Sequence, residues 1–377
     1  MHGAEDGTEA TPLTFEPVFD GHNDVLLRLW RAEQTGTDPV AAFIDGEPAG
    51  HIDLPRARSG GLAGGLCAVF VPSAGTFELG QPGVDGHYVT PMAAEVDHAT
   101  ASLASAEILD IAVRLDRAGG WTLCRSTADI RAAMAAGDFA AVLHVEGAEA
   151  IGPDLAELGR LHGLGLRSLG PVWSRPNVFG SGVPFAWPAS PDCGPGLTGA
   201  GRDLVRECNR LGIALDLAHI TEAGFWDAAS LTDAPLIVSH SNAHALTAVA
   251  RNLTDRQMDA VRERDGLVGL NFACTMLRPD GQEDAATPLS DMVRHIDHMV
   301  ARMGIGCVAL GSDFDGALIP KEIGDAAGTQ ALVRALGAAG YGPAELRRLC
   351  RENWLRVLGA AWQDSPSLPT DTDRGLT

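Results

Sequence analysis

The feature that most constrains this chain is a regular alternation of short apolar runs, typical of buried strands, with segments that have the apolar spacing of helices. The alternation recurs about eight times, and we predict strands at residues 18–24, 66–71, 140–146, 167–173, 212–219, 236–240, 267–272 and 308–313. Repeats of this kind build a parallel sheet with helical crossovers. In a chain of 377 residues they predict an α/β fold of the (β/α)8 TIM barrel type.

A doubly wound sheet is the alternative fold. It would need a Gly-x-Gly-x-x-Gly phosphate loop after the first strand, and the sequence has none there. The longest predicted helix is 91–117, with Pro91 in its first turn, and the helix at 254–264 opens with a capping box of Thr254 and Gln257. The Pro- and Gly-rich segment 174–201 is too long for a simple connection, so we expect a lid or a binding loop there.

Several predicted strands end in side chains that commonly bind metal ions. The first ends in Asp20-Gly21-His22-Asn23-Asp24, where alternate side chains share one face of the strand. Three further strands end in Glu146, His219 and His240, and the last ends in Asp313. Catalytic groups of (β/α)8 barrels lie at the carboxyl ends of the strands. We therefore expect these side chains to form one cluster.

The predicted ligands are His22, Asp24, Glu146, His219 and His240. Because a single catalytic zinc takes three protein ligands and keeps an open position, five ligands suit two ions. Glu146 is the predicted bridge, since its strand lies near the strand of the first two ligands. We expect two Zn²⁺ per chain, although such ligands also accept Mn, Co or Fe. Asp313 then remains free for proton transfer, beside Glu146 as the second catalytic group.

We consider two roles for the polar residues near the predicted metal ligands. His144 shares the face of Glu146 and could reach the metals, but buried histidines more often make structural hydrogen bonds. Asp20 and Asp216 either fix an imidazole tautomer or only hydrogen-bond at strand ends. His244 follows His240 by a helical step, and we expect it to be exposed on the next helix.

Composition restricts the class of partner. The formal net charge is −21, a surface that repels nucleic acid and anionic membranes, so we expect neither as a partner. The seven cysteines show no Cys-x-x-Cys spacing, which favours reduced, buried thiols. Residues 1–16 lack the basic-then-apolar pattern of a signal peptide, and no apolar run approaches a membrane span. The expected location is cytoplasmic.

Short motifs along most of the chain, from about residue 19 to 358, resemble those of one family. They are Asp20-Gly21-His22-Asn23-Asp24, His51-Ile52-Asp53-Leu54-Pro55, Val145-Glu146-Gly147, Asn209-Arg210-Leu211-Gly212, Asp216-Leu217-Ala218-His219, Ser239-His240-Ser241, Arg251-Asn252 and Gly311-Ser312-Asp313-Phe314-Asp315-Gly316. The chain resembles the membrane (renal) dipeptidases, peptidase family M19, within the amidohydrolase superfamily. The resemblance implies a metal-dependent hydrolase barrel at 17–362, between a flexible tail at 1–16 and a polar tail at 363–377.

The resemblance implies a binuclear zinc dipeptidase in which a metal-bridging hydroxide attacks the peptide bond. It implies that His22 and Asp24 hold one zinc, that His219 and His240 hold the other, and that Glu146 bridges them. Family members cleave dipeptides, often tolerate a D-residue at the C-terminal position, and are commonly homodimers.

Two further roles follow from the resemblance. Arg251 is similar to the family's arginine that binds the terminal carboxylate of the substrate, a task that suits a bidentate guanidinium. Asp313 is similar to the proton shuttle, which takes a proton from the bridging water and gives it to the leaving amine.

One position departs from the family. A histidine that helps to bind the scissile carbonyl often ends the fourth strand, and here Trp173 stands at that position. An indole N–H donates one hydrogen bond but carries no charge. Either a neighbour such as Arg175 or Asn177 takes over this contact with the substrate, or turnover of ordinary dipeptides is weak. Loss of one such donor costs about 100- to 1000-fold in rate.

Three functions follow in order of preference. The first is a zinc dipeptidase. The second is a metal-dependent hydrolase of another carbonyl substrate, such as an N-acyl amino acid, a lactone or a cyclic imide, which the change at Trp173 favours. The third is a non-catalytic barrel that serves as a scaffold, which conflicts with the complete ligand set. Arg251 distinguishes the dipeptidase from the hydrolase of another carbonyl substrate, because a substrate without a free carboxylate does not need this residue.

Overall fold

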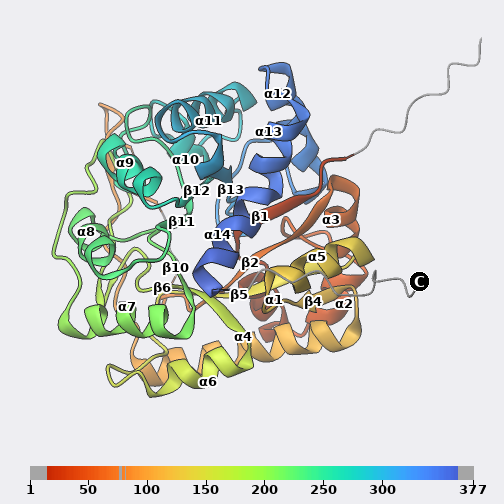
Figure 1. Cartoon of the computed structure of the whole chain (residues 1–377), viewed down its shortest axis with the longest axis vertical. Coiled ribbons are helices and arrows are strands. Elements are labelled where there is room, and N and C mark those ends of the chain that lie inside the picture. Colours follow the sequence, from red (N-terminus) through yellow and green to blue (C-terminus); the bar gives the residue numbers. More distant parts are fainter. Residues whose placement is uncertain (1–14, 76–78, 81, 364–377) are drawn as a thin grey trace, which may run out of the picture.

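The computed structural model describes residues 15–75, 79–80 and 82–363. Within them, parallel strands follow one another around a barrel with helices outside (Figure 1). In order around the barrel the strands are β1 (Val18–Asn23), β2 (Leu62–Phe70), β5 (Phe139–Glu146), β6 (Leu166–Gly170), β10 (Ala214–Leu215), β11 (Ile237–Ser241), β12 (Leu267–Leu270) and β13 (Val308–Leu310). Each contains part of one predicted strand, and the predicted (β/α)8 barrel is confirmed.

Two short parallel bridges complete the ring. Asp216 pairs with Ile237 between β10 and β11, and Asn23 pairs with Phe314 between β1 and the segment after β13. At the second bridge the backbone N–H of Asp24 donates to the Phe314 carbonyl at 2.8 Å. The second bridge lies at the carboxyl ends of β1 and β13, so the ring closes beside the predicted site at this point.

Several predicted strands end earlier in the structure, and two of them bear on the site. The segment predicted at 212–219 has only Ala214–Leu215 as strand, because the Asp216 side chain accepts hydrogen bonds from backbone N–H groups of the following turn and of β11. The strand predicted at 167–173 ends at Gly170, where the chain turns into the site.

The described helices are α1 (Val25–Gln34), α2 (Pro39–Ile44), α3 (Leu54–Gly60), α4 (His98–Ala118), α5 (Thr127–Ala136), α6 (Ala156–Leu164), α7 (Gly199–Leu211), α8 (Glu222–Leu231), α9 (Asp255–Glu263), α10 (Cys274–Leu277), α11 (Leu289–Met303), α12 (Thr329–Ala338), α13 (Pro343–Arg347) and α14 (Asn353–Trp362). The capping box of Thr254 and Gln257 is confirmed. The helix predicted at 91–117 begins instead at His98, because Asp97 caps it by accepting from the Thr100 N–H at 3.0 Å.

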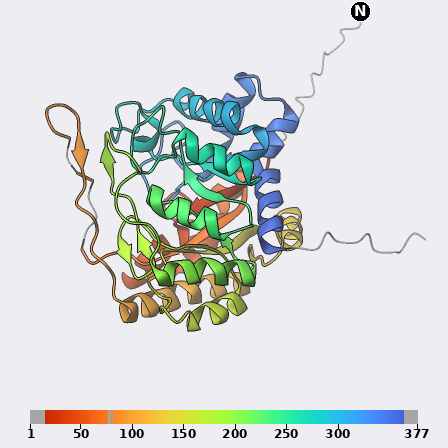
Figure 2. The same cartoon turned by 60° about the vertical axis from the view of Figure 1, so that its left-hand side comes forward.

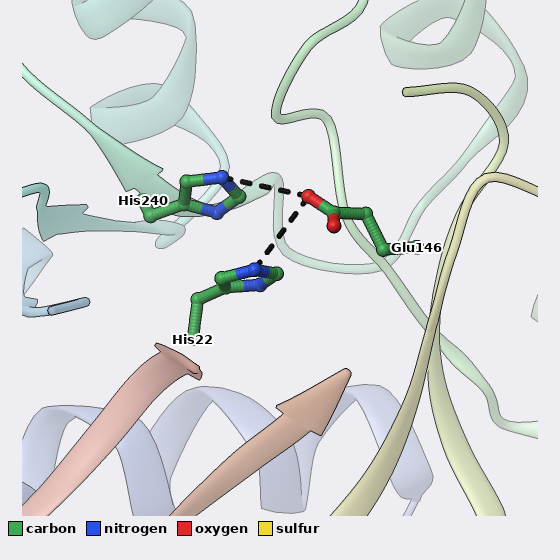
Figure 3. A group of neighbouring side chains, drawn as sticks. All are labelled: His22, Glu146 and His240. Atoms are coloured by element: carbon green, nitrogen blue, oxygen red, sulfur yellow. Dashed lines mark ion pairs between the residues drawn. The ribbon is translucent and has the colours of Figure 1, made fainter. Parts of the chain in front are cut away.

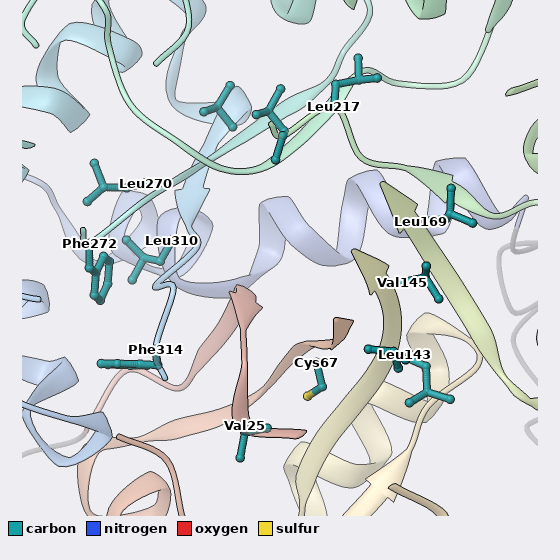
Figure 4. Close-up of a cluster of buried hydrophobic side chains, with 14 of the residues drawn as sticks. Val25, Cys67, Leu143, Val145, Leu169, Leu217, Leu270, Phe272, Leu310 and Phe314 are labelled. Carbon is teal, nitrogen blue, oxygen red and sulfur yellow. The ribbon is translucent and has the colours of Figure 1, made fainter. Parts of the chain in front are cut away.

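The core has two parts. Side chains between the strands and the outer helices form the larger part, which includes Leu143, Leu169 and Leu270 (Figure 4). Inside the barrel a second cluster packs against α14, whose Trp354 donates its indole N–H to the Leu310 carbonyl at 2.9 Å. Each fully buried side chain of this size stabilises the fold by about 1.5–3 kcal/mol. These buried side chains fill the barrel at the amino ends of the strands. The carboxyl ends therefore stay open for a site.

Two long segments lie beside the barrel. The first comprises the described residues between β2 and α4, and it includes β3 (Tyr88–Val89), which pairs with β9 (Ala186–Trp187) of the predicted binding loop (Figure 2). The same loop contains the short pair β7 (Pro176–Asn177) and β8 (Gly180–Ser181), and β4 (Trp121–Leu123) extends the sheet next to β5. No helix in these described parts is long and apolar enough to cross a bilayer. Most of the two predicted tails lies outside the described residues.

Candidate metal centre and active site

Glu146, at the end of β5, is the point on which the predicted ligands converge. Its Oε1 atom lies 3.0 Å from Nε2 of His219 and 3.6 Å from Nε2 of both His22 and His240. Figure 3 shows Glu146 facing His22 and His240 across the barrel mouth. The fifth residue, Asp24, has its Oδ2 atom 3.5 Å from Nε2 of His22. The structure therefore brings all the predicted ligands together from four different strands.

The geometry of this cluster fits a metal ion. Both ring nitrogens of His22 and Oε1 of Glu146 are buried and have no hydrogen-bond partner among the described residues. A buried polar atom without a partner costs about 1–3 kcal/mol, which an ion would offset. Ligand atoms about 2 Å from a tetrahedral ion lie about 3.3 Å apart, which matches the spacing of these atoms.

Two overlapping groups offer ligand atoms within 4.8 Å of one another. The first is His22, Glu146 and His240, and the second is His22, Asp24 and Asp313. Asp313, predicted as the proton shuttle, therefore lies within reach of a metal ion as well as of a substrate. One of its oxygens, Oδ2, accepts from Nδ2 of Asn271 at 2.9 Å, which fixes the carboxyl group. Asn271 stands directly after β12, and this place at a strand end is the signal that could have found it, although an amide is not a common metal ligand.

Burial and mutual charge shift the pKa values in this cluster. Burial opposes a charge on His22, but the charges of Glu146, Asp24 and Asp313 outweigh it and raise the His22 pKa to about 10. Burial raises the pKa of Glu146 to about 8 and also raises that of Asp313. Burial lowers the pKa values of His219 and His240 well below the usual value. Neutral imidazoles are the form that binds metals.

Serine hydroxyls orient two of the histidines. Nδ1 of His219 lies 2.8 Å from Oγ of Ser174, and Nδ1 of His240 lies 2.7 Å from Oγ of Ser239. The Ser239 hydroxyl also contacts Oδ2 of Asp216 at 2.6 Å. With Nδ1 occupied, each ring presents Nε2 to the centre, as outer partners of metal-bound histidines commonly ensure. Asp216 thus acts on the His240 imidazole through the Ser239 hydroxyl.

Three further polar residues, His144, Asp20 and His244, have hydrogen-bond partners outside the metal cluster. Nδ1 of His144 contacts Oγ of Ser168 at 3.0 Å, and its ring meets His22 edge-on. Asp20 accepts from the Ser312 N–H at 2.6 Å and ties β1 to the end of β13. The prediction for His244 was wrong, because it lies half-buried in a turn, where Nε2 contacts the Ala189 carbonyl at 2.8 Å.

A cavity of about 1270 Å³ lies over the cluster. Its lining includes Glu146, Asp313, His219, Trp173 and Arg251. This volume exceeds the range of about 300–1,000 Å³ that is usual for small-molecule sites, so the cavity admits a dipeptide.

Arg251 supplies a buried positive charge to this cavity. The side chain is 5% exposed, and its Nη2 donates to the His240 carbonyl at 3.2 Å. Its Nε is buried without a partner among the described residues. Burial lowers the pKa of Arg251 to about 10, so the group is charged at neutral pH. A carboxylate of the substrate would satisfy these donors.

Of the three residues Trp173, Arg175 and Asn177, only Trp173 lines the cavity. The Trp173 ring lies 5.7 Å from that of His219 and packs against Phe70. Arg175 is fully buried and donates to Oε1 of Glu149, to Oγ of Ser73 and to the Val71 carbonyl. It therefore cannot take the place of the missing histidine.

Asn177 does not reach the cavity either, contrary to its predicted contact with substrate. Its amide donates to the Pro171 carbonyl at 2.9 Å, and its Oδ1 accepts from the Phe179 N–H at 2.8 Å. Both ends of the amide thus hold the loop after β6, and the residue is absent from the cavity lining.

A (β/α)8 barrel with imidazoles and carboxylates gathered at the carboxyl ends of its strands defines a metal-dependent hydrolase. The family model of the membrane dipeptidases, peptidase family M19, matches residues 11–370. The chain therefore belongs to peptidase family M19, and it is a metallo-dipeptidase.

Solved structures agree with this assignment. A metallo peptidase from Rhodobacter sphaeroides, solved with a phosphinate mimic of the dipeptide L-Ala-D-Ala, is 47% identical with a TM-score of 0.88, covering 92% of this chain and 99% of that one. The dipeptidase AC, a metallo peptidase of family M19, is 48% identical with the same TM-score of 0.88 and the same coverage of 92% and 99%. By sequence, a protein of the pqqA 5′ region of Klebsiella pneumoniae is 47% identical over 246 residues, 65% of this chain and 91% of that protein.

Proposed function

We propose that this metallo-dipeptidase is a binuclear zinc enzyme that hydrolyses dipeptides, including those of the L-Xaa-D-Xaa type. The observation that carries the proposal is the convergence of three imidazole Nε2 atoms on Oε1 of Glu146, in a cavity that also contains the buried guanidinium of Arg251. The Rhodobacter sphaeroides relative bound to a mimic of L-Ala-D-Ala supports the stereochemistry.

The donor set suits two ions. His22 and Asp24 would hold one, His219 and His240 the other, and Glu146 would bridge them. When bound, the ions supply polarisation of the scissile carbonyl and a nucleophilic water at neutral pH. We propose Zn²⁺ because imidazole and carboxylate ligands in such an arrangement suit it.

The chain's own residues then complete the site. Arg251 binds the C-terminal carboxylate of the dipeptide and so fixes which end enters the cavity. Asp313 takes the proton of the attacking water and returns it to the leaving amine, a task helped by its raised pKa. Trp173 forms an apolar wall beside His219 and holds the substrate away from solvent.

A dipeptide panel tests this proposal. The zinc-reconstituted protein is given L,L and L,D dipeptides, beside an Asp313→Asn variant and metal-free protein. We expect hydrolysis that needs metal, includes L,D members and falls by at least about 100-fold in the variant. Bound zinc at two ions per chain without cleavage of any dipeptide would contradict the substrate assignment.

A second substrate class follows from Trp173. The cavity wall beside His219 carries no charged donor at this position, because Arg175 is fully engaged beneath it. A lactone or a cyclic imide has a better leaving group than an amine and needs less stabilisation of this kind, and an N-acyl amino acid belongs to the same alternative class of carbonyl substrate. Hydrolysis of such a compound at a rate above that of every dipeptide would favour this alternative.

We further propose a homodimer in a reducing, cytoplasmic compartment. The seven cysteines are free and all but Cys193 are buried, which suits reduced thiols. Light scattering of the purified protein at micromolar concentration would give the mass, and a monomer would contradict the proposed assembly.

A further inference from the structure

The motif His51-Ile52-Asp53-Leu54-Pro55 has no role in the metal centre, yet it lies at the edge of the cavity. Most of its residues have a local structural task. Asp53 caps α3 by accepting from the Arg56 N–H at 2.8 Å, Pro55 occupies the first turn, and Ile52 is fully buried. His51 differs from them, because it is half-buried and lines the cavity.

His51 and Asp315 bind each other through a reciprocal pair of hydrogen bonds. The backbone N–H of His51 donates to Oδ1 of Asp315 at 2.5 Å, and the backbone N–H of Asp315 donates to Nδ1 of His51 at 2.9 Å. Because Nδ1 accepts, the neutral ring carries its hydrogen at Nε2. The Ala326 N–H also donates to the His51 carbonyl at 3.0 Å, so His51 itself is firmly placed.

The loop that His51 holds carries Asp313 in an unusual conformation. Asp313 and Asp315 have φ values of 59° and 67°, in the left-handed region that non-glycine residues rarely adopt. Such backbone persists only where surrounding contacts determine it. On one side the Asp313 N–H donates to the His22 carbonyl at 3.0 Å, and on the other side the contact is the His51–Asp315 pair.

Gly316 shows how closely this loop fits the site. A Cβ atom at Gly316 would lie 2.3 Å from Oδ2 of Asp24 and 2.5 Å from Oδ1 of Asp313. A shift of the loop by even one ångström would therefore displace the Asp313 carboxyl group from its place beside Asp24. Misplacement of this size typically costs about 100-fold in rate.

Arg28 joins the pair to the first strand. Its Nε lies 3.1 Å from Oδ2 of Asp315, and its Nη2 donates to the Ile52 carbonyl at 2.5 Å. Arg28 stands one helical turn after Asp24, and its N–H donates to the Asp24 carbonyl at 3.1 Å. The contacts thus link the loops after β1 and β13 to the His51 segment.

We propose that His51 is a positioning residue for Asp313, acting through its Nδ1 atom on the backbone of Asp315. The kinetic part of this inference rests on the proposed function of Asp313, whereas the structural part does not. The functional atom of His51 is therefore Nδ1, which faces the loop, and not the Nε2–H donor.

Two isosteric substitutions separate the two ring nitrogens. In His51→Asn the amide oxygen can take the place of Nδ1, and in His51→Gln the amide group takes the place of Nε2. Both are made in the full chain, reconstituted with zinc, beside His162→Asn as a control on the distant helix α6. The measurements are kcat and KM on the best dipeptide, thermal unfolding, metal content, and hydrogen–deuterium exchange of the Asp315 amide.

We expect His51→Asn to keep kcat within about 3-fold of the wild type and to leave the Asp315 amide protected. His51→Gln should lower kcat by about 10- to 100-fold at unchanged KM and metal content, and should speed exchange of that amide at least about 10-fold. If His51→Gln does not fold, His51→Phe, which keeps the ring edge against Phe314, replaces it with the same expected result.

The opposite order, with His51→Gln active and His51→Asn impaired, would overturn the proposal and assign the role to Nε2. Equal effects of both substitutions, whether large or absent, would also overturn it. If the wild-type protein cleaves no dipeptide, the proposed function fails, and the exchange of the Asp315 amide alone decides the positioning role.

Discussion

Arg251 is the residue whose charge most directly selects a substrate. Replacement by Met should lower kcat/KM for dipeptides by about 100- to 1000-fold, because a buried charge-assisted pair with the substrate carboxylate is lost. Hydrolysis of the corresponding dipeptide amides should stay within a few-fold of the wild-type rate. Arg256→Met, on an exposed side chain, is the control. A loss of equal size on the amides would show that Arg251 does not read the carboxylate.

Ser239 makes a second prediction at the residue scale. Its hydroxyl stands between Nδ1 of His240 and Oδ2 of Asp216, so Ser239→Ala should free the ring and leave a buried carboxylate with fewer donors. We expect metal affinity to fall by about 10- to 100-fold, as for outer partners of metal ligands. A competition assay with a zinc chelator measures this. Ser168→Ala, beside His144, should have a smaller effect, and equal effects would argue against a special role of Ser239.

The sequence indicated the metal ligands because each ends an apolar run, where the strand period fixes the direction of the side chain. Ser174 could not be identified in this way, since its contact with His219 depends on how the loop after β6 folds over the barrel mouth. Dependence on loop folding also explains why the predicted contact of Asn177 with substrate was wrong. A polar side chain in a loop can turn to substrate or to its own backbone, and only the fold decides.

Among the strands, β12 gives the sharpest prediction at the scale of the element. A Cβ atom at Gly269 would lie 2.0 Å from the carbonyl oxygen of Ser239 in the neighbouring strand β11. Gly269→Ala should therefore destabilise the barrel by about 1–3 kcal/mol or more. Urea unfolding measures the midpoint and the m-value together. Gly306→Ala, where no atom lies within 4 Å, is the matched control, and equal midpoints for the two variants would contradict the close contact.

The order of strands and helices was predictable because local periodicity reports which faces are buried. The boundaries of the elements were less predictable, because caps and side-chain contacts set them. α4 begins at His98 and not near Pro91, since Asp97 provides the cap. β10 stops at Leu215, where Asp216 takes hydrogen bonds from the next turn. The antiparallel pairing of β3 with β9 joins segments about 100 residues apart, which no local pattern reveals.

At the scale of the whole molecule, the metal centre joins strands from opposite parts of the chain. Its predicted ligands run from His22 to His240, so ions bound there would cross-link β1, β5 and β11 at the mouth of the barrel. Ligands that bind only the folded state stabilise it by mass action. Removal of metal by chelation should lower the melting temperature by about 5–15 °C. Calorimetry with and without zinc tests this, and an unchanged melting temperature would contradict a buried metal cross-link.

The same centre should make metal affinity depend on pH. In the metal-free chain the negative charges of Glu146, Asp24 and Asp313 raise the His22 pKa, so the cluster around His22 and Glu146 holds a proton at pH 7. Metal ligands must be deprotonated, so each ion competes with protons there. The apparent affinity should therefore rise as the pH increases from 7 through 8 and towards 10. Calorimetric titration at pH 7 in buffers of different ionisation enthalpy should show about one to two protons released per chain. Binding without proton release would mean that the cluster is already deprotonated, and the charges around Glu146 would then have to be balanced by groups other than His22.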